Sequence, residues 1–216
     1  MFPIGDDNSA RKSFPLVTYA LIALNVLIFF VELSGGDALV MQWAFVPRRF
    51  MGDPIADAPT LFSSMFMHAG WLHLGGNMLY LWIFGDNVED RFGHITFLIF
   101  YLLCGLAATG AQLSFSLGSG VPNLGASGAI AGVLGAYLLM FPQGRVRVLT
   151  YSRVMDVPAL MAIGLWFALQ LLSSVGSLAR ADRTGGGVAY MAHVGGFVAG
   201  LVLGLLFRGG RRAVDA

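Results

Sequence analysis

The sequence has few charged residues and a single cysteine. Charged side chains account for 12% of its 216 residues and hydrophobic ones for 56%, whereas a soluble domain carries about 25% charged residues. Because this fraction of charged residues is too small to cover a water-facing surface, we expect most of the surface to face lipid. Cys104 excludes an internal disulfide and is interpreted as a structural free thiol. The formal net charge of +1 argues against a nucleic-acid partner, which needs a clustered basic face.

The N-terminal region is typical of a retained membrane helix. Residues 1–14 are polar and contain Arg11 and Lys12, and the apolar run that follows, 15–33, is about 19 residues long. A signal peptide has a shorter apolar core of about 7–15 residues and a cleavage site with small residues. We therefore interpret 15–33 as the first membrane-spanning helix and 1–14 as a short cytoplasmic tail.

Six segments approach the length needed to cross a bilayer, about 17–25 residues. These segments are 15–33, 73–88, 94–113, 125–141, 155–175 and 188–207. The second and the fourth are short and rich in glycine, which suggests that the other helices enclose them. The sequence thus predicts an all-α integral membrane protein, with a six-helix membrane domain over 15–207 and a basic cytoplasmic C-terminal tail over 208–216.

The distribution of lysine and arginine indicates the orientation of this domain. If the N-terminus is cytoplasmic, six spans return the C-terminus to the same side. Nine of the 13 basic residues then lie on the cytoplasmic side and four on the outer side, as the positive-inside rule requires. We expect a multi-pass protein of the cell (inner) membrane with both termini in the cytoplasm.

The connection 34–72 is too long and too aromatic for a simple polar loop. Its large rings belong to Trp43, Phe45, Phe50, Phe62, Phe66 and Trp71. Amphipathic aromatic side chains favour the membrane interface. We expect this first loop to be membrane-associated, and an ordinary folded extracellular loop is the alternative.

Polar residues inside spans are costly and indicate function. Three sets stand out: His73 with Asn77 in the second span, Ser127 in the fourth and His193 in the sixth. With a cytoplasmic N-terminus, these three spans all begin at the outer face. All three polar sets are therefore expected at one level, in the outer half of the membrane.

Small residues suggest how two of these helices meet. Gly128 and Gly132 form a small-xxx-small pair in the fourth span, and His193 shares a narrow stripe with three glycines of the sixth span, Gly196, Gly200 and Gly204. Such stripes let membrane helices approach closely. Packing the stripes together would set the imidazole of His193 beside the hydroxyl of Ser127.

A serine beside a histidine is suited to nucleophilic catalysis, since the base activates the hydroxyl. Donors for a developing oxyanion are available from His73, from Asn77 and from the backbone at the start of the fourth span. Gly125 and Gly128 leave room for a substrate backbone, and His68 is either a support or an interfacial residue. Because Asp86 follows His73 by 13 residues, about 20 Å along a helix, we expect a dyad without a carboxylate.

These residues together resemble the rhomboid family of intramembrane serine proteases. The resemblance runs from about Leu61 to Gly204 and rests on four segments: His68–Asn77 (HAGWLHLGGN), Phe84–Gly93 (FGDNVEDRFG), Gly125–Gly128 (GASG) and Ala192–Gly196 (AHVGG). It implies a six-helix core that cleaves single-span membrane proteins in or near their helix, without metal or nucleotide. It also implies Ser127 as nucleophile, His193 as base, and His73 with Asn77 in the oxyanion hole.

The resemblance carries further expectations and one departure. Glu89 and Arg91 are expected to be structural, and span five is expected to border a lateral gate at which Trp166 or Phe167 guards substrate entry. Some members of the family carry a tyrosine one turn after the serine, stacked on the catalytic histidine. Here that position is Ala131, so other packing must hold His193.

Other functions fit the sequence less well. A non-catalytic relative that binds membrane proteins would be expected to lose the serine or the histidine, and both are present. A metalloprotease would need a His-Glu-x-x-His motif, and a transporter would show two similar halves. His73 and His193 could serve as haem ligands, but that leaves the glycine-flanked serine unexplained. The oligomeric state and the natural substrate are not encoded in any recognisable motif.

Overall fold

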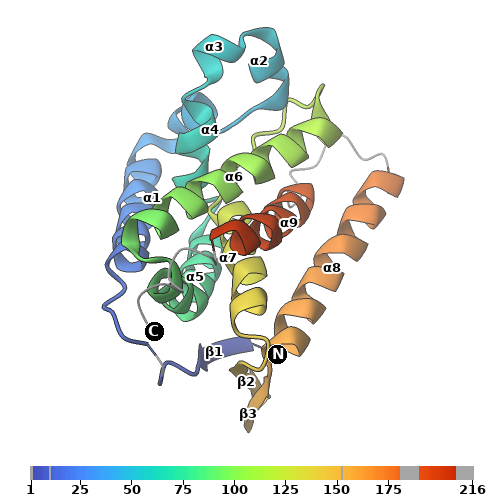
Figure 1. Ribbon diagram of the computed structural model, residues 1–216. Helices are drawn as coiled ribbons and strands as arrows, with labels where there is room; N and C mark the ends of the chain where they lie inside the picture. Colours follow the sequence, from blue (N-terminus) through green and yellow to red (C-terminus); the bar gives the residue numbers. More distant parts are fainter. Residues whose placement is uncertain (1, 10, 152, 181–189, 208–216) are drawn as a thin grey trace.

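The computed structural model describes residues 2–9, 11–151, 153–180 and 190–207. Within them, six helices of 14 or more residues form a bundle (Figure 1): α1 (Leu16–Trp43), α5 (Trp71–Phe92), α6 (His94–Ser116), α7 (Ser127–Met140), α8 (Ala159–Arg180) and α9 (Tyr190–Phe207). Among the described residues, α1, α6 and α9 are long and apolar enough to cross a membrane. The expected basic tail, 208–216, lies outside the described residues. The chain is a mostly helical membrane protein.

The centre of the bundle is α7, which packs against α5, α6 and α9. Every residue from Gly128 to Tyr137 is buried. This is possible because the helix consists mostly of glycine, alanine and aliphatic residues, and a helix that is apolar all round is buried all round. The expectation that a short, glycine-rich fourth segment is enclosed by the others is confirmed.

The contact between α7 and α9 is made backbone to backbone through the glycine stripes. A Cβ atom added to Gly196 would lie 2.0 Å from the carbonyl oxygen of Gly128, and one added to Gly200 would lie 2.1 Å from that of Gly132. Real side chains do not fit into such gaps. The packing of the two stripes predicted from the sequence is therefore confirmed.

The start of α1 is fixed by a buried carboxylate of α5. Glu89, which is fully buried, accepts hydrogen bonds from the backbone N–H groups of Val17 (2.8 Å) and Thr18 (2.7 Å) and from the Thr18 hydroxyl (2.6 Å). Its other contact is with His94 at 2.5 Å. The first turn of a helix leaves N–H groups without intrahelical partners, and a carboxylate there is favourable. Glu89 thus joins three helices, which is a structural role.

The connection after the first helix is more ordered than a loop. Helix α1 does not end near residue 33 as expected but continues to Trp43 beyond a kink at Gly36, where φ is 62°. Glycine tolerates this backbone geometry without strain. Four short helices follow, α2 (Pro47–Gly52), α3 (Pro54–Asp57), α4 (Thr60–Ser63) and the 3₁₀ helix η1 (Ser64–Phe66). Phe45 is fully buried, and its backbone pairs with Asn123 before α7.

A three-stranded antiparallel sheet lies at the end of the bundle where α8 begins (Figure 1). The first strand, β1 (Phe2–Asp6), comes from the N-terminal segment and pairs with β2 (Arg145–Thr150), which pairs with β3 (Arg153–Pro158). In β2, Val146 and Val148 are buried, and Arg145 and Arg147, which alternate with them, are exposed. The N-terminal segment is therefore a strand bound to the connection between α7 and α8, which the expectation of a simple polar tail missed.

Asp6, at the end of β1, ties the sheet to the helices. Its carboxylate accepts hydrogen bonds from the Tyr137 hydroxyl of α7 (2.8 Å) and from the Asn87 amide of α5 (2.8 Å). Burial, opposed in part by the bond from Tyr137, and the nearby charge of Asp86 raise the pKa of Asp6 to about 7. Ionisation of Asp6 therefore occurs near neutral pH.

We expect the stability of the fold to fall as the pH rises from about 4 to about 7, because Asp6 has a higher pKa when folded than when unfolded. A carboxyl group whose pKa is raised by folding stabilises the fold at low pH. That contribution is lost as the pH rises from the pKa of the unfolded state to the pKa of the folded state. Asp6→Asn keeps the shape without the charge and should raise the Tm at pH 8.5 by a few degrees, with little effect below about pH 4, where Asp6 is neutral in both states. Thermal unfolding in detergent measures this, and Asp7→Asn is the control because Asp7 is exposed. A pH-independent difference between wild type and Asp6→Asn would contradict it.

Candidate active site

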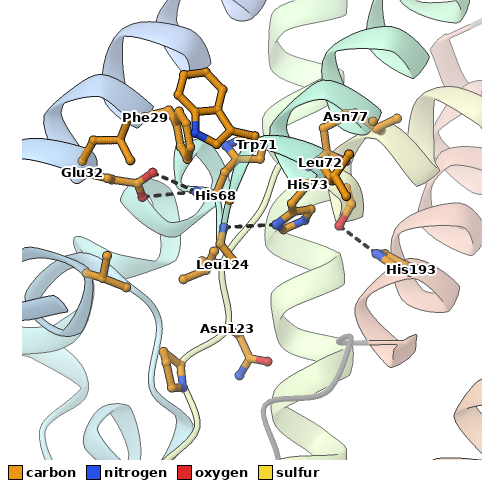
Figure 2. A pocket seen from close by; sticks show the side chains of 18 of the residues that line it. Phe29, Glu32, His68, Trp71, Leu72, His73, Asn77, Asn123, Leu124 and His193 are labelled. Carbon is orange, nitrogen blue, oxygen red and sulfur yellow. Dashed lines mark hydrogen bonds between the residues drawn. The ribbon is translucent and has the colours of Figure 1, made fainter. Parts of the chain in front are cut away.

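Ser127 and His193 lie within hydrogen-bonding distance. The Ser127 Oγ is 2.7 Å from the His193 Nε2 (Figure 2). Ser127 is the first residue of α7, and His193 lies in the first turn of α9. Gly128 and Gly196 meet immediately beside the pair, so the close approach of the two helices sets this distance. A hydroxyl that donates to an unprotonated Nε2 has the arrangement of a nucleophile and its base.

A large cavity opens onto this pair. Its volume is about 960 Å³, and it extends from Trp166 and His193 to Phe29 and Glu32 on α1. Ser127, His73 and Asn77 all line it. A space of this size accommodates several residues of an extended peptide.

His73 is oriented by the backbone before it. The Ala69 N–H donates to the His73 Nδ1 at 3.3 Å, as Figure 2 shows. A neutral imidazole that accepts at Nδ1 carries its proton on Nε2. This Nε2 faces Gly125, where an added Cβ would lie 2.9 Å from it and 3.6 Å from the Ser127 Oγ. Glycine at position 125, with φ at 131°, leaves the imidazole room beside the serine.

Asn77, the other expected donor, lines the same cavity. It lies one turn after His73 on α5 and is buried, and its Nδ2 has no hydrogen-bond partner among the described residues. A buried amide donor without a partner is costly and calls for an explanation. A partner for it would have to come from the cavity, whose wall includes Asn77. The structure places the expected site residues Ser127, His193, His73 and Asn77 on the wall of the large cavity. Gly125 and Gly128 line a second, small pocket that Ser127 also lines.

His68 contacts both α1 and His73, and its partner on α1 was missed by sequence reasoning. Its backbone N–H donates to both carboxylate oxygens of Glu32 on α1, at 3.2 and 3.0 Å, and its ring lies edge-on to His73 with centroids 5.1 Å apart. Figure 2 shows Glu32, His68 and His73 side by side in a row along the cavity wall. A carboxylate within an apolar span is itself a signal of function, and it would have identified Glu32.

The carboxylates at the other end of α5 are occupied elsewhere. Asp86 pairs with Arg11 at 2.5 Å, and Asp90 accepts from the Ser13 backbone and hydroxyl. Arg91 lies over the ring of Phe141 at 5.3 Å. These contacts fasten the N-terminal segment and the end of α7. In the part of the chain that the structure describes, no group of three His, Cys, Asp or Glu residues is placed to hold a metal ion.

The chain resembles known proteins along most of its length. The family model of the Rhomboid domain matches residues 56–210. The chain is 31% identical over 194 residues to "Rhomboid protein 1, mitochondrial" of Saccharomyces cerevisiae, covering 87% of this chain and 52% of that protein. It is 33% identical over 210 residues to "Rhomboid protease GluP" of Bacillus subtilis, covering 94% and 38% respectively. The chain thus spans about half or less of the length of these relatives.

Proposed function

The chain belongs to the rhomboid family, and on that premise we propose that it is an intramembrane serine endopeptidase with Ser127 as nucleophile and His193 as general base. The observation that carries the proposal is the 2.7 Å contact between Ser127 and His193 at the wall of a cavity of about 960 Å³. The geometry of the two residues and the names of the relatives support it independently.

The reaction follows from the placement of the donors. As the Ser127 Oγ attacks a substrate carbonyl carbon, its proton passes to the Nε2 of His193. The negative charge that develops on the carbonyl oxygen is stabilised by the His73 Nε2–H, the Asn77 Nδ2 and the backbone N–H groups at the start of α7. When the C–N bond breaks, His193 returns the proton to the leaving amine. A water molecule then releases the acyl group from Ser127 by the same steps.

The proposed substrates are single-span membrane proteins, cleaved within or near their transmembrane helix. A carbonyl in an intact helix is hydrogen-bonded and cannot reach Ser127, so the substrate must unwind locally. Small or helix-breaking residues near the cleaved bond should favour this. The cavity, which reaches from α9 to α1, supports an extended rather than a helical bound segment.

We place the protein in the membrane with six spans, α1 and α5 to α9, and with both termini cytoplasmic. The domains proposed are a short cytoplasmic tail (1–14), the membrane domain (15–207) and a basic tail (208–216), with the segment 34–72 associated with the outer interface. The relatives include both mitochondrial and bacterial proteins. The excess of basic residues on one side favours the cell (inner) membrane with the site in its outer half.

The proposed oxyanion hole makes a specific prediction. Asn77→Ala should lower kcat by about 10²-fold and change KM little, because the amide acts on charge that develops only in the transition state. Steady-state cleavage of a labelled single-span substrate in liposomes measures both constants. Asn123→Ala is the matched control, since Asn123 also lines the cavity. Equal losses in the two variants would remove Asn77 from the oxyanion hole.

The function itself is tested with a reagent and a substrate together. A fluorophosphonate forms a covalent bond to an activated serine with loss of fluoride, and we expect it to modify Ser127 of the purified chain, as mapped by mass spectrometry. The same preparation, reconstituted in liposomes, should cleave a single-span substrate at a bond in or beside its helix. A folded chain that neither reacts at Ser127 nor cleaves any of several substrates would instead favour a binding protein.

A further inference from the structure

The ring nearest to His193 from the neighbouring helix α8 is that of Trp166. The centroids of the indole and the imidazole are 5.8 Å apart, with an angle of 42° between the ring planes. Both rings line the cavity. One turn after Ser127, α7 carries Ala131, whose methyl group is fully buried and offers no aromatic surface. The aromatic contact of the imidazole is therefore supplied by α8.

Trp166 also contacts α5, and its neighbour Phe167 contacts α9. On α5, the ring of Tyr80 lies 6.4 Å from it at 40°. On α8, the next residue, Phe167, stacks on Phe197 of α9 with centroids 4.3 Å apart at 24°. Helix α8 thus contacts α9 through two adjacent aromatic residues, of which Trp166 contacts the imidazole and Phe167 contacts the helix behind it. Figure 1 shows α8 at the edge of the bundle.

We propose that Trp166 is a positioning residue whose indole holds the imidazole of His193 against Ser127. The inference rests on the proposed function. An imidazole can rotate about its side-chain bonds, and a base must stay within about 2.6–3.2 Å of the hydroxyl to activate it. A packed indole face removes alternative orientations, and aromatic pairs of this kind prefer tilted or offset geometry.

This role differs from that of a gate. A gate residue would limit the entry of a large helical substrate and leave the reaction of a small, diffusible reagent unchanged. A positioning residue governs the reactivity of Ser127 toward both. The two roles therefore separate when a fluorophosphonate and a transmembrane substrate are compared on the same variant.

The experiment compares Trp166→Leu and Trp166→Phe with Phe167→Leu, the matched control that removes the neighbouring aromatic contact of α8 and leaves the indole on the imidazole. Trp166→Leu should lower both the fluorophosphonate reaction rate and kcat by about three- to tenfold, with KM unchanged, as the loss of one aromatic pair implies. Trp166→Phe should retain most of the rate, and Phe167→Leu should react like the wild type. Wild-type reactivity in Trp166→Leu, or equal losses in Trp166→Leu and Phe167→Leu, would overturn the proposal.

A second readout does not depend on catalysis. Diethyl pyrocarbonate carbethoxylates accessible imidazoles, and mass spectrometry assigns the product to each of the four histidines. We expect His193 to be modified several times faster in Trp166→Leu than in the wild type, with the rate at His94 unchanged. If the wild type neither cleaves nor reacts with the fluorophosphonate, the proposed protease function fails. The carbethoxylation rate of His193 still reports whether the indole of Trp166 covers its imidazole. An unchanged rate at His193 would overturn the positioning role.

Discussion

Replacing Ser127 with alanine is expected to abolish cleavage of membrane protein substrates without changing the fold. The substitution removes one oxygen atom, which is the atom 2.7 Å from the His193 Nε2. Alanine retains the Cβ and is compatible with the first position of α7. Loss of a nucleophile from such an arrangement costs about 10⁴-fold or more in kcat. The residual rate should therefore fall below detection in a liposome assay with a labelled single-span substrate.

Ser64 provides the matched control for this substitution. Its side chain is buried and lines a small space next to Ser127, and its carbonyl oxygen accepts a hydrogen bond from the Gly125 N–H. Ser64→Ala leaves that backbone bond in place and should cleave like the wild type. Equal cleavage by Ser127→Ala and the wild type would refute Ser127 as the nucleophile. Equal losses in Ser127→Ala and Ser64→Ala would show that any change near α7 disturbs the site.

The core of the site could be predicted from the sequence because membrane helices carry strong local rules. Polar residues in apolar spans are rare, so Ser127 and His193 stood out against their surroundings. Glycines at three- and four-residue spacing identify the face on which a helix packs. Since α7 and α9 meet on those faces, the two residues had to come together. Two independent patterns agreed, and the geometry followed from them.

The features that the sequence did not reveal depend on contacts between distant segments. The alternation in β2 could have indicated a strand, but its partner β1 lies more than a hundred residues earlier and has no clear pattern. The extension of α1 to Trp43 reflects the tolerance of one glycine, Gly36, for a kink. The contact of Trp166 with His193 depends on how α8 sits against α9, which no local spacing encodes.

The fold and the site both depend on the contact between the glycines of α7 and α9. We therefore expect a substitution in this contact to have the largest effect on stability. Gly200→Ala places a Cβ 2.1 Å from the Gly132 carbonyl oxygen and 2.5 Å from the Gly132 Cα. Both are backbone atoms of α7, so no side chain can rotate away. The helices must separate by about 1 Å, and overpacking of this kind costs roughly 1–3 kcal/mol or more. We expect a clearly lower Tm in detergent and less folded protein.

The fraction that does fold should also lose activity, because α9 carries His193 one turn before Gly196 and two turns before Gly200. A shift of α9 away from α7 lengthens the hydrogen bond between Ser127 and His193 beyond the range in which a base is effective. Gly110→Ala is the control: it is a helical glycine of α6 with nothing among the described residues within 4 Å of the added Cβ. It should unfold at or slightly above the wild-type temperature, since alanine favours a helix over glycine. If Gly200→Ala matched Gly110→Ala in both Tm and cleavage rate, the close packing of α7 on α9 would not determine the distance between Ser127 and His193.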